Sequence, residues 1–282
     1  DHLAEVLAVV GKHFRGARIL EVGCGKGRFL GMMRAAGHDA IGIDPAYEGD
    51  DPGIVKRHFG PDAGVRGDAI VLRHTLEHLD DPLGFLEGLR EANGGGGLIY
   101  IEVPCLDWIL AHRAWFDFFY EHVNYFRPGD FQRLFGRVAE TGHLFGGQYL
   151  YAVADLATLR ASGSLPPASP VQVPRDLFGN IDAALARMGT GHRTVVWGAA
   201  AKGVMFCHHA SSRGLAVAFA IDINPAKQGR FLAGSGVEVL SPADGLARLA
   251  PGDHVVVMNS NYLDEITRAG GPHLDYIPMD TP

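Results

Sequence analysis

Hydrophobic positions follow two different spacings along the chain. Between positions 2 and 14, apolar residues recur at the three- and four-residue intervals of an amphipathic helix: Leu3, Val6, Leu7, Val10 and Phe14. Residues 17–23 form a short apolar run that closes on glycine, which is typical of a strand, and residues 28–36 return to helical spacing. The chain therefore opens with a helix, a strand, a glycine loop and a second helix.

The same alternation continues through the first half of the chain. Short apolar runs at 40–44, 68–72 and 97–103 predict further strands, and residues 82–92 predict a helix between the last two. Strands that alternate with helices are joined by right-handed crossovers into a mostly parallel sheet. We expect an α/β protein.

A break in the pattern predicts two domains. Residues 161–174 are rich in Pro, Ser and Gly, and four prolines there are incompatible with helix interiors and central strands. A second alternating series follows, with helices predicted at 177–188 and 202–209 and strands at 193–197, 216–221 and 253–258. We expect a first domain over 1–158, a linker over 159–176 and a smaller α/β domain over 177–282.

Composition excludes several classes of protein. The chain has 282 residues and a net charge of −7, which disfavours a nucleic-acid partner. Its three cysteines lie far apart, so we expect neither a disulfide framework nor a cysteine-rich metal site, and a cytoplasmic setting fits best. No apolar run approaches the roughly 18 residues of a membrane span. The chain begins at Asp1 rather than Met and shows no signal peptide, so an upstream segment is possible.

The first glycine loop has the form acid-x-Gly-x-Gly-x-Gly over residues 21–27, with Glu21, Gly23, Gly25 and Gly27. Glycines there permit positive φ and a close ligand, and the following helix points free N–H groups at it. The spacing differs from the dinucleotide form GxGxxG, and a carboxylate at Glu21 suits an ammonium better than a pyrophosphate. At the end of the next strand Asp44 can accept both ribose hydroxyls. A plain tight turn or a nicotinamide site remains the alternative for the loop alone.

Together these residues resemble class I S-adenosylmethionine-dependent methyltransferases. A further match is Leu-Glu-His-Leu-Asp-Asp-Pro at 76–82, and the resemblance covers roughly residues 15–155. It implies a Rossmann-like first domain in which the glycine loop packs on S-adenosylmethionine, Asp44 holds its ribose and His74 lies on the cofactor side. Because the 14 histidines show no HExxH-like spacing, we expect no metal.

An aromatic stretch at 115–126 carries the Glu121-His122 pair. Aromatic side chains around a site exclude water. An imidazole has an ordinary pKa near 6.5, so His122 can take a proton at neutral pH while a carboxylate such as Glu121 orients the ring. The alternative is an aromatic core segment with a satisfied histidine.

This stretch, with the segment 145–149, resembles the C-methyltransferases of nucleotide-linked 4-ketosugars. Segments 196–203 and 222–230 resemble the Rossmann-like C-terminal domain of that family, which binds the substrate nucleotide. The resemblance implies an enolate mechanism with His122 as base, and with His78 and either Tyr120 or Glu121 at the keto oxygen. It further implies that the nucleotide sugar, a small molecule, is held by Lys202, Asn224, Lys227, Arg230 and Tyr149.

Two features depart from that family. Its usual zinc-binding N-terminal domain is absent from this sequence, and the position of its catalytic tyrosine holds Phe119, with Tyr120 displaced by one residue. An O-methyltransferase for a glycan or small hydroxylated metabolite is therefore an alternative. An NAD(P)-dependent oxidoreductase and a non-catalytic nucleotide-binding module are alternatives of another class. The second domain can also serve as a platform for a homodimer.

Overall fold

A seven-stranded sheet forms the centre of the first part of the chain. The computed structural model describes residues 2–188 and 191–279. The strands follow the order β3-β2-β1-β4-β5-β7-β6, and all are parallel except β7. Their bounds are β1 Arg18–Val22, β2 Asp39–Ile43, β3 Ile54–Val55, β4 Ala69–Arg73, β5 Leu98–Pro104, β6 Val138–Leu144 and β7 Tyr149–Asp155.

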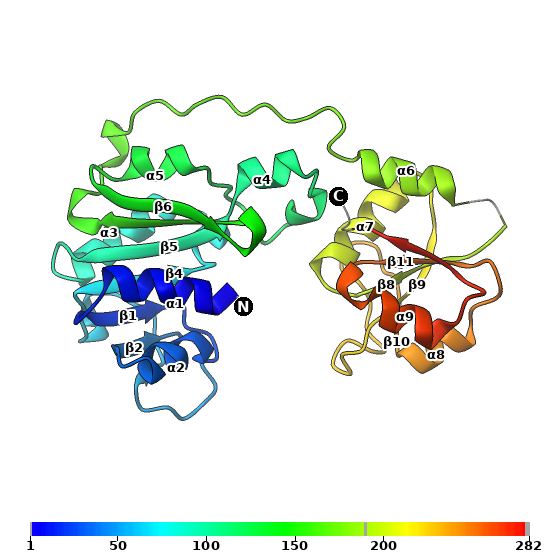
Figure 1. Ribbon diagram of the computed structural model, residues 1–282, viewed down its shortest axis with the longest axis horizontal. Coiled ribbons are helices and arrows are strands. Elements are labelled where there is room, and N and C mark those ends of the chain that lie inside the picture. Colours follow the sequence, from blue (N-terminus) through cyan, green and yellow to red (C-terminus); the bar gives the residue numbers. More distant parts are fainter. Residues whose placement is uncertain (1, 189–190, 280–282) are drawn as a thin grey trace. The chain divides into compact units, whose positions relative to one another are not determined.

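Helices cover both faces of this sheet (Figure 1). On one face α1 and α2 bury apolar side chains such as Val10 and Leu30 against the strands, and on the other α3 and α5 bury Leu89 and Phe131. The helices are α1 His2–His13, α2 Arg28–Ala35, α3 Pro82–Ala92, α4 Leu106–Ala111 and α5 Pro128–Leu134. Helix α3 starts where predicted because Pro82 suits the first helical position and the Asp81 side chain accepts a hydrogen bond from the Gly84 N–H.

A second, smaller sheet lies in the rest of the chain. Its five strands are all parallel in the order β10-β9-β8-β11-β12. They are β8 Thr194–Trp197, β9 Val217–Ile221, β10 Val239–Leu240, β11 His254–Val257 and β12 Asp275–Pro278. The accompanying helices are α6 Gly179–Arg187, α7 Ala201–Ser212, α8 Pro242–Ala247 and α9 Leu263–Gly270. The predicted α/β class with two mostly parallel sheets is confirmed.

The division into units differs from the predicted boundaries in one segment. The first unit contains the chain up to Ile109 and Tyr120–Val171, whereas Leu110–Phe119 belongs to the second unit together with the chain from Gln172 onward. Trp115 explains this, because its fully buried ring packs against Phe206 and His209 of α7. A segment that the sequence placed within the first domain is therefore part of the second unit.

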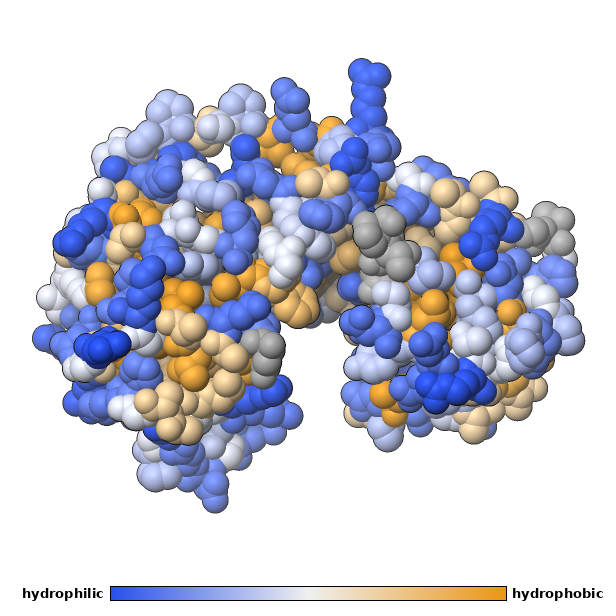
Figure 2. Space-filling view, viewed as in Figure 1, coloured by the Kyte–Doolittle hydropathy of each residue, from blue (hydrophilic) through white to orange (hydrophobic). Residues whose placement is uncertain are grey.

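The proline-rich stretch that the sequence predicts as a linker has no helix or strand between residues 165 and 174. Two arginines of the first unit hold part of it, because Arg127 donates to the carbonyl of Pro170 and Arg133 to that of Pro166. On the face shown in Figure 2, hydrophilic residues cover most of the surface and hydrophobic ones show in small groups. In the described parts of the chain, no helix has the length and apolarity needed to cross a membrane.

Candidate functional site

The first glycine loop leaves β1 with its backbone in left-handed conformations. Gly23, Gly25 and Gly27 have φ values of 75°, 54° and 75°. A Cβ on Gly27 would lie 2.8 Å from Ile54 Cδ1, so a side chain there would collide with the core. The Gly25 N–H donates to Asp44 Oδ2 over 2.8 Å, and the other carboxylate oxygen accepts from the Ala46 N–H at the same distance. The predicted cofactor residues are thus brought together by direct bonds between the loop and the end of β2.

Glu21 lies beneath this loop at the end of β1. Its side chain is 3% exposed, and its Oε2 atom has no hydrogen-bond partner among the described residues. Burial raises the pKa of Glu21 to about 7, although the positive charge of Arg73 acts in the opposite direction. A buried carboxyl oxygen without a partner is costly in the free protein and available to a ligand that donates hydrogen bonds.

Glu102 forms the centre of a charged cluster on the same face of the sheet. It is fully buried on β5 and is paired in register with Arg73 of β4, whose Nε lies 3.1 Å from Glu102 Oε1. His2 of α1 lies 3.1 Å from the same oxygen, and the Tyr100 hydroxyl donates to the other over 2.9 Å. Burial raises the pKa of Glu102, but the hydrogen bond from His74 and the charge of Arg73 outweigh it and lower the pKa to about 2.

His74 connects this cluster to the turn that follows β4. It has a positive φ of 46°, its Nε2 lies 3.0 Å from Glu102 Oε1, and its Nδ1 lies 3.2 Å from Glu77 Oε1. Burial disfavours the charged ring, yet the bonds to Glu102 and Glu77 prevail and raise the pKa of His74 to about 9. The Tyr149 ring lies edge-on, 4.6 Å from the His74 ring. The structure therefore places Tyr149 beside a predicted cofactor residue, in the first unit.

Two imidazoles meet above the buried Glu77. The rings of His78 and His122 are 4.9 Å apart, and His78 Nδ1 donates to the carbonyl of Glu121 over 2.7 Å. Two further bonds join the turn to this loop, because the Glu77 carbonyl accepts the N–H groups of Val123 and Asn124 at 2.9 and 3.1 Å. Two motifs that are far apart in the sequence thus form one cluster.

The other two predicted catalytic side chains point elsewhere. Tyr120 is 74% exposed, and its hydroxyl donates to Glu121 Oε1 over 3.0 Å. That hydrogen bond raises the pKa of Tyr120. Since Glu121 is also exposed, the buried carboxylate next to the imidazoles is that of Glu77, which is 1% exposed.

The second unit repeats the arrangement of the first loop. Asp222 at the end of β9 accepts the Ala199 N–H and the Asn224 N–H, each over 2.8 Å, as Asp44 does in the first unit. It differs in carrying a cation, because Lys227 Nζ lies 3.1 Å from Asp222 Oδ2. Burial by itself would raise the pKa of Asp222. The two N–H bonds and the charge of Lys227 together outweigh burial, so the pKa of Asp222 lies below its ordinary value.

Four of the five predicted substrate residues lie around this second loop. Gly198 has a φ of 116°, and Lys202 Nζ lies 4.0 Å from the centre of the Phe116 ring. Arg230 is exposed in the loop after β9. Of the predicted substrate residues, Lys202, Asn224, Lys227 and Arg230 therefore share the second unit, and Tyr149 lies in the first.

Comparison with known families decides the nature of this chain. Residues 2–138 match the family model described as a methyltransferase domain, and residues 175–274 match the C-methyltransferase C-terminal domain. The chain belongs to the S-adenosylmethionine-dependent methyltransferases. The cofactor and enzyme class expected from the sequence are confirmed, and the oxidoreductase and non-catalytic alternatives are wrong.

Individual relatives of this methyltransferase differ in how much they share with it. The C-methyltransferase NovU of Streptomyces niveus is 26% identical over 89% of this chain and 68% of its own length. A ubiquinone biosynthesis O-methyltransferase of Cereibacter sphaeroides is 30% identical over 30% of this chain and 40% of its own. A solved S-adenosylmethionine-dependent methyltransferase from Archaeoglobus fulgidus is 20% identical, covers 54% of this chain and 94% of its own, and has a TM-score of 0.41.

Sequence reasoning missed the residues that connect the methyltransferase site. Glu102 lies inside an apolar strand run and Arg73 directly follows another, and a charge in such a place is a signal of a buried polar cluster. Asn124, whose side chain donates to the carbonyls of Leu76 and Leu79, gives no comparable signal. Its role depends on a turn that lies 45 positions earlier in the chain.

Among the residues that the structure describes, two groups of side chains have the spacing of metal ligands: His2, His74 and Glu102, and Glu77, His78 and His122. In the first group Arg73 already occupies the same oxygen of Glu102 that the histidines share. A guanidinium there opposes a second cation. In the second group the ligating atoms lie within 4.8 Å of one another.

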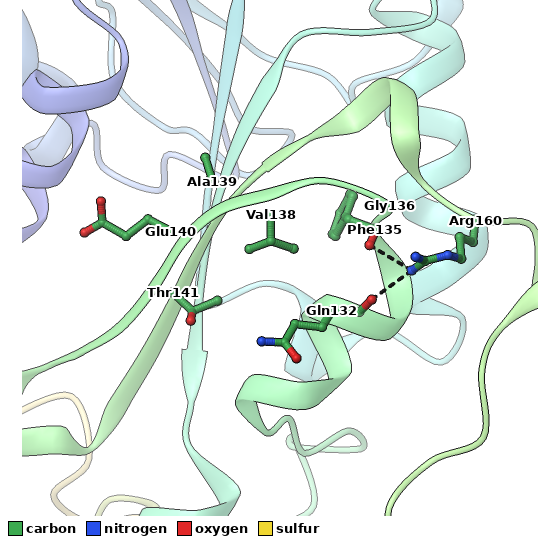
Figure 3. A pocket seen from close by; sticks show the side chains of 8 residues that line it. All are labelled: Gln132, Phe135, Gly136, Val138, Ala139, Glu140, Thr141 and Arg160. Carbon is green, nitrogen blue, oxygen red and sulfur yellow. Dashed lines mark hydrogen bonds between the residues drawn. The ribbon is translucent and has the colours of Figure 1, made fainter.

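A pocket lies apart from these residues, at the outer strand β6 and helix α5 (Figure 3). Arg160 is its one cationic side chain, and Figure 3 shows it turned to the carbonyls of Gln132 and Phe135, to which it donates over 2.8 Å. Its charge is therefore used to hold the C-terminal end of α5. None of the predicted site residues lines this pocket.

Proposed function

We propose that this methyltransferase transfers a methyl group to a carbon next to the ketone of a nucleotide-linked sugar. The observation that carries the proposal is the pairing of a methyltransferase domain with a second unit that matches the C-methyltransferase C-terminal domain. The relative that is similar over most of the chain is named a C-methyltransferase. An O-methyltransferase is the competing function, and the O-methylating relatives match about 30% of this chain.

The first glycine loop has the chemistry to hold S-adenosylmethionine. The unpartnered Oε2 of Glu21 suits the ammonium of the methionine part. The bare backbone of Gly23, Gly25 and Gly27 permits close approach, and each oxygen of Asp44 accepts one N–H and keeps a lone pair for a ribose hydroxyl. When bound, the cofactor supplies an electrophilic methyl group on a sulfonium.

We assign the proton transfer to His122. The ketone acidifies the neighbouring C–H, His122 takes the proton, and the electron pair left on carbon forms the new bond to the methyl group as the carbon–sulfur bond breaks. His78 Nδ1 is committed to the Glu121 carbonyl, so its Nε2 is the atom that can reach the keto oxygen or relay the proton. The protein contributes position and a site protected from water.

The second unit supplies the proposed nucleotide site. Lys202 lies in the first turn of α7, which follows β8, and Lys227 and Arg230 lie on the loop after β9. Basic side chains at the carboxyl ends of these strands can neutralise a diphosphate. Asn224 follows Asp222 in the same turn, and Asp222 can accept a ribose hydroxyl as Asp44 does in the first unit. Tyr149, in the first unit beside His74, is assigned to the sugar.

Hydrogen exchange tests the proposed reaction. The enzyme is incubated in D₂O with dTDP- and UDP-linked 4-ketosugars and S-adenosylhomocysteine, and deuterium at the carbon beside the ketone is followed by NMR. We expect exchange without any methyl donor, and its loss in His122→Ala with S-adenosylhomocysteine affinity retained. Methyl transfer to a hydroxyl with no exchange would favour the O-methyltransferase. Exchange that persists in His122→Ala would remove His122 as the base.

A further inference from the structure

We propose that Glu77 is the positioning carboxylate of the imidazole pair, and that it stabilises the positive charge formed when the base takes its proton. The inference rests on the proposed C-methylation. It differs from the sequence-based expectation, in which Glu121 is the carboxylate that orients His122. A base is most effective when a third group holds it in the required orientation.

Burial and connectivity single out this carboxylate. Glu77 is 1% exposed, and His74 holds one of its oxygens, Oε1, at 3.2 Å. The other oxygen, Oε2, is buried without a hydrogen-bond partner among the described residues. Such an atom is costly unless a positively charged or hydrogen-bonding group approaches it during function.

The two imidazoles are the groups within reach. One carboxylate oxygen of Glu77 and one ring nitrogen each from His78 and His122 lie within 4.8 Å of one another. Both nitrogens therefore lie near hydrogen-bond range of the carboxylate, and catalytic bonds commonly tighten only when substrate is bound. Because Glu77 is buried, its charge is screened less than that of an exposed carboxylate at the same distance.

The neighbouring charges fit this assignment. His74 is held between Glu102 and Glu77, so one cation is shared by two buried carboxylates. The second oxygen of Glu77 makes no hydrogen bond among the described residues and is available to the imidazole pair. Glu121, by contrast, is exposed and bonded to the exposed hydroxyl of Tyr120, where water screens its effect on an imidazole.

The test compares Glu77→Gln with Glu140→Gln in the full chain. Glu140, on strand β6, is a matched control because its carboxylate also bonds a histidine: Glu140 Oε2 lies 2.6 Å from His13 Nε2. We measure kcat, KM, the donor-free exchange rate, the affinity for S-adenosylhomocysteine and the melting temperature. Replacing a carboxylate that serves a catalytic imidazole costs about 10²–10⁴ in rate.

For Glu77→Gln we expect kcat and the exchange rate to fall by at least about 100-fold, while KM and the affinity for S-adenosylhomocysteine change less than about threefold. Glu77→Asp, which keeps the charge, should recover part of the rate, and Glu140→Gln should match the wild type. A folded Glu77→Gln with wild-type kcat would overturn the proposal. So would parallel loss of rate and S-adenosylhomocysteine binding, because that pattern indicates a purely structural role.

Metal analysis of the same samples tests whether Glu77, His78 and His122 instead bind a divalent metal. A stoichiometric divalent metal in the wild type that Glu77→Gln loses would make the three side chains ligands and overturn the positioning role. Failure of the proposed function has a different signature, since the wild type itself would then show no exchange with any ketosugar. In that case the role of Glu77 falls with the function on which it rests.

Discussion

His78 Nδ1 lies 2.7 Å from the carbonyl oxygen of Glu121, a residue 43 positions later in the chain. A carbonyl only accepts, so this bond requires the proton of His78 on Nδ1 and leaves Nε2 to act on a ligand. The backbone bonds of Glu77 to Val123 and Asn124 hold the same loop. The position of His122 therefore depends on a turn that follows β4.

Asn124→Ala should loosen this loop. The Asn124 side chain donates to the carbonyls of Leu76 and Leu79. The Leu76 carbonyl keeps the Leu79 N–H, but removing the donor to the Leu79 carbonyl costs on the order of 1–3 kcal/mol. We expect a lower melting temperature and a kcat reduced about tenfold, with little change in the affinity for S-adenosylhomocysteine. Calorimetry and steady-state kinetics measure both. Unchanged kcat in a destabilised variant would show that the loop is held by its backbone bonds alone.

Glu21 should make cofactor-product binding depend on pH. Its pKa of about 7 means that half of the free protein carries a neutral Glu21 near neutral pH, whereas an ammonium ligand favours the charged form. The dissociation constant of S-adenosylhomocysteine should therefore rise about tenfold from pH 8 to pH 6. Glu21→Gln should bind weakly with a flatter profile. A wild-type profile as flat as that of the variant contradicts the role of Glu21.

The same carboxyl affects stability in the opposite sense. Because its folded pKa is raised above the ordinary 4.5, the stability that it contributes is fully present below about 4.5 and is lost as pH rises through about 7. Without ligand, wild type should therefore lose more stability than Glu21→Gln between pH 5 and pH 8. Urea unfolding at the two pH values measures this difference.

His74 should contribute to the free energy of unfolding at pH values below its raised pKa. Its pKa is raised to about 9 from 6.5, so its contribution is fully present below pH 6.5 and is lost as pH rises through 9. A shift of this size corresponds to about 3 kcal/mol. Denaturant unfolding should show a steeper loss of stability between pH 7 and pH 9.5 in wild type than in His74→Gln. Equal slopes would indicate that Arg73 and His2 neutralise Glu102 without help from His74.

The glycine loop allows a paired test of strain and collision. Gly25→Ala places a side chain at positive φ in open space, which costs on the order of 1–2 kcal/mol. Gly27→Ala has the same strain and in addition meets Ile54 Cδ1, so we expect a larger fall in the free energy of unfolding. Adding Ile54→Val, which removes that methyl group, should recover part of the difference. No recovery would place the cost of Gly27→Ala in the backbone alone.

Lys227 should contribute to nucleotide affinity in the second unit. It lies 3.1 Å from Asp222 Oδ2, at the loop proposed to hold a diphosphate. We expect Lys227→Met to weaken dTDP or UDP binding about tenfold in calorimetry and to reduce its salt dependence. Arg248→Met is the control, because Arg248 pairs with Glu238 elsewhere in the same unit. Equal effects of both variants would point to net charge instead of a specific contact.

Local signals account for the elements that were predicted well. Helix α3 has its predicted bounds, because Asp81 and Pro82 define its first turn within a few residues. Strands β6 and β7 were not predicted, since β7 is antiparallel and its place depends on pairing with β5. Segment Leu110–Phe119 was assigned to the first domain by its place in the sequence, but the burial of Trp115 against α7 decides its unit.

The features of the site also divide into those set by local sequence and those set by tertiary structure. Local sequence determined the glycine loop, because positive φ at Gly23, Gly25 and Gly27 is a property of those residues, and the loop already indicated the cofactor. Tertiary structure alone decided which carboxylate lies buried beside the imidazoles. Burial and distance set the strength of a charge, and the folding of the turn after β4 against the loop at His122 buries Glu77 and leaves Glu121 in water.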